Sequence, residues 1–315
     1  MADTPASYPL RALSIGEIFD RAVTIFVRNF VVFTAMVFTL LAPYAVVQYF
    51  FIPADQNSFA SILAQMQHPT TSQTQAQVSM APGALAALIF FTMIFLLLVP
   101  FVNNAVAVGV AELYNGRAPQ YGASFKAVLR RSLPLFGTAL LSGLIIGAVY
   151  MGVLMALVIV VVIGVALVKV LLPLAIVMFV LAAIGVLALI VVLMMLLLVY
   201  AFATYATSLE GASVTEAIAS AFRRVLNRHE FRKALLMALA YLALQLGVLM
   251  VSSTVTVLVS LLLKNYAVQL AVTAIFSAVL TAFLTILVAV YYYDVRTRSE
   301  GLDLEVDLGR LTAAS

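Results

Sequence analysis

The chain alternates between long apolar runs and short segments that hold most of its charges. Six of the runs are longer than the ~20 residues that a bilayer-crossing helix needs. Their apolar residues are continuous and do not alternate with polar ones as in the strands of a membrane barrel. The pattern therefore predicts an all-α integral membrane protein with six transmembrane helices. They are expected at about residues 30–52, 83–110, 137–163, 171–203, 234–263 and 268–292.

Two residues mark the boundary between the third and fourth predicted spans. Lys169 and Pro173 interrupt an apolar stretch of roughly 65 residues, which is far too long for one span. A turn is therefore expected between about residues 163 and 171.

A different pattern precedes the first span, in the stretch LSIGEIFDRAVTIFVRNF. Ser14 and Glu17 have the spacing of a capping box, in which each side chain bonds to the backbone of the other at a helix start. Charged residues, among them Arg21, occupy one face of the predicted helix. The apolar residues recur at helical spacing on the other face: Ile15, Ile18, Phe19, Ala22, Val23 and Phe26.

The same pattern returns 199 residues later, so that Ser213 and Glu216 correspond to Ser14 and Glu17. The apolar face then comprises Val214, Ala217, Ile218, Ala221, Phe222 and Val225, and the basic residues of the segment are Arg223, Arg224, Arg228, Arg232 and Lys233. A third copy covers 122–136 and repeats the Gly-Ala-Ser start of 211–213. It lacks the capping Glu, and Pro134 is expected to shorten its helix.

These copies predict one membrane domain, 1–315, built from three hairpins, each preceded by a cytoplasmic amphipathic helix. The units cover about 13–110, 122–203 and 211–293, followed by a cytoplasmic tail at 294–315. The alternative is that amphipathic helices share this spacing by chance. An apolar face that cannot stay in water is expected to lie in the membrane interface or to pack beneath the bundle.

Composition and charge support a membrane protein and give it an orientation. Of the 315 residues, 65% are apolar and 10% charged, against roughly one-quarter charged in a soluble domain. Of the 17 Lys and Arg, only Lys169 and Lys264 fall on the side of the long segment 53–82. The positive-inside rule then places both termini in the cytoplasm of a bacterial inner-membrane protein. Segment 53–82 is expected to be an external loop, either a polar connection or a ligand lid.

The opening segment, Leu13 to Arg21, together with Glu210-Gly211 leading to Arg223, resembles the bacterial membrane-domain family named after glycerophosphoryl diester phosphodiesterases. The resemblance implies a multi-span membrane module that acts as a partner or membrane anchor. The phosphodiesterase part has no counterpart here, because the chain has only His68 and His229, predicted on opposite sides of the membrane, and no paired acidic motif between them.

Chemistry-bearing motifs are few. The chain has no cysteine, and it contains no Walker loop, dinucleotide-binding glycine pattern, HExxH or nucleophile elbow. No catalytic, metal or cofactor site is therefore predicted. Asn103, Asn104 and Gln245 lie inside spans, where they either line a polar cavity or hydrogen-bond between helices. Gly143 and Gly147 form a GxxxG motif that is expected to pack within the bundle.

The sequence thus favours a non-enzymatic membrane scaffold or accessory protein. Its amphipathic helices would bind lipid, with anionic headgroups attracted to the basic residues, and a membrane-protein partner. A role in nucleic-acid binding is not expected, because a cytoplasmic loop of a membrane protein explains the same charges. The alternative is a transporter or flippase for a lipid or amphipathic substrate, built from repeated hairpins around a polar interior.

Overall fold

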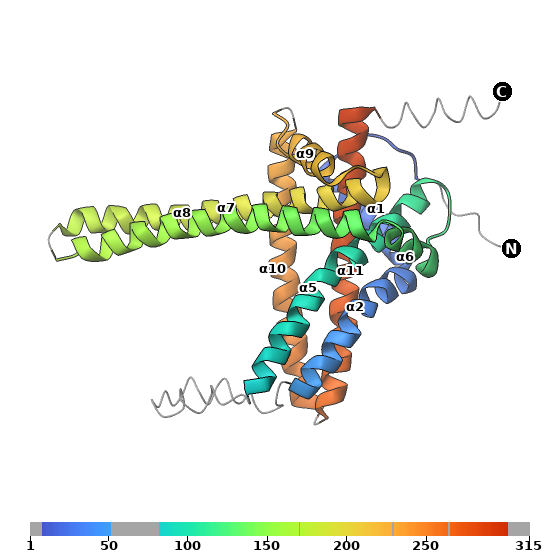
Figure 1. The fold of residues 1–315 in the computed structure, drawn as a ribbon, viewed down its shortest axis with the longest axis horizontal. Helices are drawn as coiled ribbons and strands as arrows, with labels where there is room; N and C mark the ends of the chain where they lie inside the picture. Colours follow the sequence, from blue (N-terminus) through green and yellow to red (C-terminus); the bar gives the residue numbers. More distant parts are fainter. Residues whose placement is uncertain (1–7, 52–81, 170, 229, 264, 302–315) are drawn as a thin grey trace. The chain divides into compact units, whose positions relative to one another are not determined.

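The computed structural model describes residues 8–51, 82–169, 171–228, 230–263 and 265–301, and all regular structure in these ranges is helical. This confirms the all-α fold class. The predicted loop 53–82 and both histidines fall outside the described residues, except for Pro82. The elements, shown in Figure 1, are α1 (Ile15–Arg28), α2 (Phe30–Phe51), α5 (Pro82–Tyr114), α6 (Tyr121–Leu129), α7 (Ser132–Leu167), α8 (Leu172–Tyr205), the π-helix η2 (Ala206–Glu210), α9 (Val214–Val225), α10 (Phe231–Leu262) and α11 (Tyr266–Glu300).

Five helical segments are long and apolar enough to cross a membrane. They are Phe30–Phe50, Ser132–Leu167, Leu172–Glu210, Phe231–Leu262 and Tyr266–Glu300. The predicted span at 83–110 coincides with α5, of which the shorter segment Leu98–Tyr114 qualifies as an apolar helix among the described residues. The chain is therefore a multi-pass helical protein, with the sixth span still a prediction.

The chain divides into two compact units. The first comprises Met1–Arg130, Leu244–Thr297 and Leu302–Ser315, of which the described part holds α1, α2, α5, α6 and most of α11. The second comprises Arg131–Ala243 and Arg298–Gly301, and it holds α7, α8, η2 and α9.

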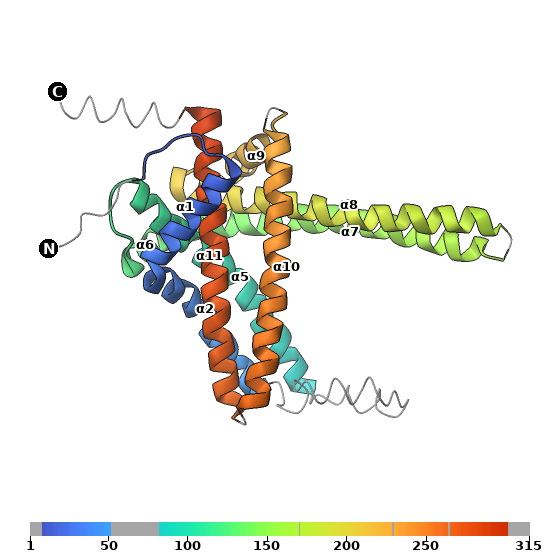
Figure 2. The ribbon, with the colours of Figure 1, turned by 180° about the vertical axis from the view of Figure 1, so that it is seen from behind.

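In the first unit, α2 packs against α5, as Figure 2 also shows. Phe33 and Met36 of α2 and Val106 and Val110 of α5 are fully buried. At Gly109 the two helices come so close that an added Cβ would lie 2.9 Å from the Phe33 ring. A glycine at this position therefore allows the contact, as small residues do between membrane helices.

In the second unit, α7 and α8 form a hairpin along which both helices stay in contact. Close approach falls at Gly164, where an added Cβ would lie 3.2 Å from Phe179. Gly143 and Gly147, which were predicted to pack within the bundle, have no described atom of another segment within 4 Å of an added Cβ, so the α7–α8 contact does not use them. The i, i+4 spacing does not say which side of a helix its partner will meet.

The amphipathic segment at 122–136 differs from its expected form. A helix over 122–136 was predicted, shortened by Pro134. The structure instead ends α6 at Leu129 and starts α7 at Ser132. Pro134 lies in the first turn of α7, where proline is tolerated because the first N–H groups of a helix have no intrahelical acceptor.

Candidate functional site

The best-defined local feature is the start of α1, where the predicted capping box is present. The Glu17 backbone N–H donates to the Ser14 hydroxyl at 3.3 Å, and the Ser14 N–H donates to the Glu17 carboxylate at 2.7 Å. Arg11 donates to the same carboxylate at 2.6 Å. These bonds use two N–H groups that would otherwise have no partner at the helix end.

The same bonds lower the pKa of Glu17 to about 2 from an ordinary value of 4.5, with the Ser14 backbone N–H as the largest cause, followed by the Ser14 hydroxyl and Arg11. Because the folded-state pKa is depressed, the ionised carboxylate stabilises α1 fully above about pH 4.5. That contribution is lost as the pH falls toward about 2.

One face of α1 is closed off by protein. Ile18, Ala22 and Ile25 are fully buried, and their spacing of four and three residues marks a single stripe. Phe26 also touches Phe283 of α11, with ring centroids 5.9 Å apart. The apolar face was predicted either to lie in the membrane interface or to pack beneath the bundle, and these buried residues pack against the bundle. Phe19, from the same predicted face, is half-buried.

Three further contacts hold the N-terminal segment in place. The backbone N–H of Leu13 donates to the buried carboxylate of Asp294 at 2.6 Å, joining the start of α1 to α11. Arg21 donates to the Pro9 carbonyl at 2.9 Å and lies 5.9 Å from the centroid of the Tyr114 ring. Arg21 was predicted on the charged outer face of the helix. Its contacts with Pro9 and Tyr114 could not be predicted from its position on that helix.

The second copy keeps the position of the cap but not its bonds. Ser213 is the N-cap of α9, as its match to Ser14 predicts, and α9 starts at Val214. The Ser213 side chain accepts no backbone bond there, and its hydroxyl lies 3.4 Å from the Glu216 carboxylate. The second capping box is therefore wrong as predicted, although the helix boundary is correct.

The inner face of α9 contains an ion network that sequence reasoning missed. Arg224, predicted as one of several interfacial cations, is only 8% exposed. Its two terminal nitrogens donate to the two carboxylate oxygens of Glu210 at 2.8 and 2.9 Å, and its Nε donates to Glu300 at 2.7 Å. Two carboxylates thus compensate one buried guanidinium, a pairing that burial of an arginine requires.

Local backbone geometry brings Glu210 to this network. Gly211 follows η2 with a φ of 79°, in the left-handed region that favours glycine. An added Cβ at Gly211 would also meet the guanidinium of Arg131. The glycine reverses the chain after η2, so that α9 runs back and places Arg224, in its last turn, beside Glu210.

A polar hollow of about 360 Å³ lies beside the network. Ser220 of α9, Asn227 just after that helix and Ser299 of α11 line it together with the charged groups. The Ser220 hydroxyl donates to the Ala217 carbonyl at 2.9 Å, as serines inside helices commonly do. Of the predicted interfacial residues, Glu216 in the first turn of α9, Arg223 in its last turn and Arg228 beyond it are exposed. Ile218 is buried and Phe222 half-buried.

The residues predicted for a polar cavity lie on α5 and α10. Asn104 is fully buried and donates to the Pro100 carbonyl of its own helix at 2.7 Å. Asn103 accepts from Thr285 of α11 at 3.4 Å. Of the two roles considered from the sequence, a polar cavity or hydrogen bonding within the bundle, both amides have the second: they form hydrogen bonds within a helix or between helices. Gln245 is half-buried in α10.

Comparison of the chain with protein-family models, with curated proteins and with solved structures finds no match. Its class therefore rests on the fold, which is that of a multi-pass helical membrane protein. The resemblance to the phosphodiesterase-associated membrane family stays a prediction based on the short motifs around Leu13 and Glu210.

The two caps allow a matched test. Replacing Ser14 by Ala removes an N-cap acceptor, and we expect α1 to lose about 1 kcal/mol of local stability. Ser213→Ala is the control, because its side chain accepts no such bond, and it should change α9 much less. Hydrogen-exchange mass spectrometry on peptides from 15–28 and 214–225 measures both. Equal loss of protection in the two helices would contradict the assignment of the caps.

The ion network gives a second test. Arg224→Gln leaves two carboxylates without their cation, and we expect a loss of about 1–3 kcal/mol, less than for a fully buried pair because the Glu300 side chain remains 34% exposed. Arg223→Gln, on the exposed side of α9, should stay within about 0.5 kcal/mol. Denaturant unfolding of the purified protein compares them.

A third variant checks the cause of that loss. Glu210→Gln added to Arg224→Gln removes one of the two uncompensated charges, and part of the stability should return. A further loss in the double variant would show that Arg224 acts through packing and not through charge compensation.

Proposed function

We propose that this protein is a non-enzymatic membrane scaffold or accessory protein that binds lipid and a membrane partner through its cytoplasmic amphipathic helices. One observation carries the proposal: α1 has a second apolar stripe that the bundle leaves open. Val23 and Val27 of α1 and Val31, in the first turn of α2, follow one another at intervals of four residues and are 46%, 65% and 76% exposed. Arg28 lies beside this stripe, in the last turn of α1.

Such a helix fits the boundary between protein, lipid and water. Its inner stripe packs on the bundle, its outer stripe suits the acyl region just below the headgroups, and its cation suits anionic headgroups. Each Lys or Arg near an anionic surface contributes about 1 kcal/mol. Removing the exposed part of a valine from water contributes a similar amount, at roughly 25 cal/mol per Å².

The other two amphipathic segments have comparable features. Leu129 and Leu133 are strongly exposed, and Arg130 and Arg131 lie between them in sequence. After α9, Leu226 and Phe231 are exposed. Basic residues accompany Leu226 and Phe231 as well, namely Arg228, Arg232 and Lys233.

The membrane orientation belongs to the same proposal. We place both termini and all three amphipathic helices in the bacterial cytoplasm, and we assign α5 as the sixth span. Its 33 residues extend about 50 Å at 1.5 Å per residue, more than the ~30 Å hydrocarbon core. An even number of spans returns the C-terminus to the starting side, where the basic residues gather.

The alternative of a transporter or flippase for an amphipathic substrate has less support. A transport path would need polar groups free to meet the substrate near the bilayer midplane. Asn103 and Asn104 instead have hydrogen-bond partners within the protein. The proposal therefore favours a lipid- and partner-binding role.

Orientation can be tested by labelling, because the chain has no cysteine. Single variants Ala219→Cys, on the exposed side of α9, and Asn265→Cys, between α10 and α11, should react with a membrane-impermeant maleimide from opposite sides. In intact cells only Asn265→Cys should label, and inverted vesicles should show the reverse. Labelling of both from one side would refute the proposed topology.

Lipid binding is tested on the open stripe. Val23→Ser with Val27→Ser should keep the fold, since both side chains are exposed, and should lower the amount of co-purifying anionic phospholipid measured by native mass spectrometry. Val158→Ser with Val162→Ser, an exposed pair of the same spacing on α7, is the matched control and should retain that lipid.

The same purification tests the scaffold role. If the wild-type protein carries neither enriched anionic lipid nor a membrane-protein partner, the proposed function is wrong. An unchanged lipid content in the Val23 and Val27 double variant would instead show that the lipid binds elsewhere.

A further inference from the structure

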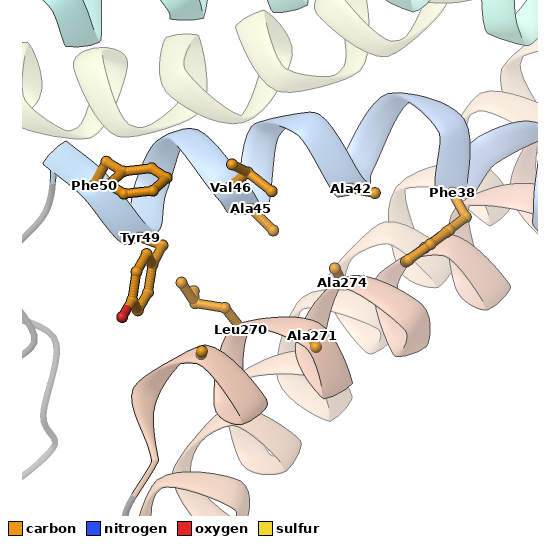
Figure 3. A pocket seen from close by; sticks show the side chains of 10 residues that line it. Phe38, Ala42, Ala45, Val46, Tyr49, Phe50, Leu270, Ala271 and Ala274 are labelled. Atoms are coloured by element: carbon orange, nitrogen blue, oxygen red, sulfur yellow. The ribbon is translucent and has the colours of Figure 1, made fainter.

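A groove of about 360 Å³ lies between α2 and α11 in the first unit. Figure 3 shows the side chains of both helices directed toward it. Ala42 and Ala45 of α2 face Ala271 and Ala274 of α11 across the groove. Methyl side chains cannot bridge the space between the helices, so the groove remains open along its middle.

Larger side chains close its two ends. Phe38 lies at the end nearer the start of α2, and Tyr49 and Phe50 lie at the other. The ring of Tyr49 stacks on that of Tyr266, with centroids 6.0 Å apart and planes at 24°. This pair joins the last turn of α2 to the first turn of α11 and defines the outer end of the groove.

The lining is apolar, with the Tyr49 hydroxyl as the one side-chain polar group among its ten residues. An apolar cavity does not hold ordered water, which needs two to four polar partners. Unfilled space between helices also forfeits dispersion contacts, which are the main attraction between surfaces in hydrocarbon. The occupant should therefore be an apolar molecule available within the bilayer.

The dimensions select one occupant. From Phe38 to Tyr49 the groove extends along α2 for about 16 Å at 1.5 Å per residue. One leaflet contributes about half of the ~30 Å hydrocarbon core. An acyl chain of a single leaflet thus matches the groove in length, and aromatic residues such as Tyr49 and Tyr266 are typical of the interface where a headgroup begins.

We infer that the groove binds one acyl chain of a phospholipid from the outer leaflet, with the headgroup beside Tyr49 and Tyr266. The inference rests on the proposed membrane placement and adds a second lipid site to it. This site differs from the cytoplasmic stripe in chemistry, because it recognises a chain by shape and not a headgroup by charge.

The test uses the full-length protein in phosphatidylethanolamine vesicles in which one acyl chain carries a diazirine at its middle. After photolysis, mass spectrometry should locate cross-links mainly on peptides from 38–50 and 267–274. Ala42→Phe and Ala271→Phe fill the groove and should lose these cross-links. Ala156→Phe, the same change at an exposed alanine of α7, should leave them unchanged.

A variant of opposite effect guards against misfolding. Leu270→Ala enlarges the groove and should retain or increase the cross-links. Uniform labelling of all lipid-facing peptides, or unchanged labelling in the filled variants, would overturn the inference. So would cross-linking of a second copy of the chain through the groove residues, since that copy would then be the occupant.

The two lipid proposals fail separately. The filled variants should keep the anionic phospholipid that co-purifies with the wild type, while the Val23 and Val27 double variant should keep the groove cross-links. Loss of the groove labelling alone in the wild type would overturn the acyl-chain site and leave the stripe. Absence of enriched anionic lipid with intact groove labelling would overturn the stripe and leave the groove.

Discussion

The constraint on which the structure depends is that a bilayer offers the backbone no hydrogen-bond partner. Every N–H and C=O inside the hydrocarbon must be satisfied within the chain, so long apolar segments become helices. The exceptions must occur where helices end and water or protein side chains are available. In this protein several charged side chains with defined contacts, among them Glu17 and Arg224, lie in the first or last turn of a helix. The polar chemistry is therefore concentrated in the connections between spans.

The same constraint explains how much the sequence could predict. Helix starts at Ser14 and Ser213 and the boundaries of α2 and α10 follow from local signals, namely capping residues and the change from charged to apolar sequence. Such signals act within one turn of helix and need no knowledge of the fold. The capping bonds do not follow from the same signals, because the Ser213 hydroxyl donates to the Glu216 carboxylate and accepts no bond from the backbone.

Contacts between distant residues could not be predicted in this way. Arg224 looks like one cation in a basic cluster until Glu300, 76 residues later, is seen to approach it. Asp294 likewise looks like the charged end of a span, yet it accepts a bond from Leu13, 281 residues earlier. The groove between α2 and α11 depends on the distance between two helices, which the alanine spacing of either helix does not determine. The sequence therefore predicts which segments form helices, but not which helices and side chains contact one another.

The two proposed lipid sites rest on different physical effects. Where water is present, at the amphipathic helices, apolar exposure is unfavourable and cations are attracted to headgroups, so valines beside an arginine form a surface that suits the interface. Within hydrocarbon neither effect operates between apolar surfaces, and only the fit of one surface to another remains. In the groove between α2 and α11, alanines leave space between the helices and aromatic rings close its ends. This shape is what would hold an acyl chain. The proposed scaffold would thus distinguish lipids by charge at one site and by shape at the other.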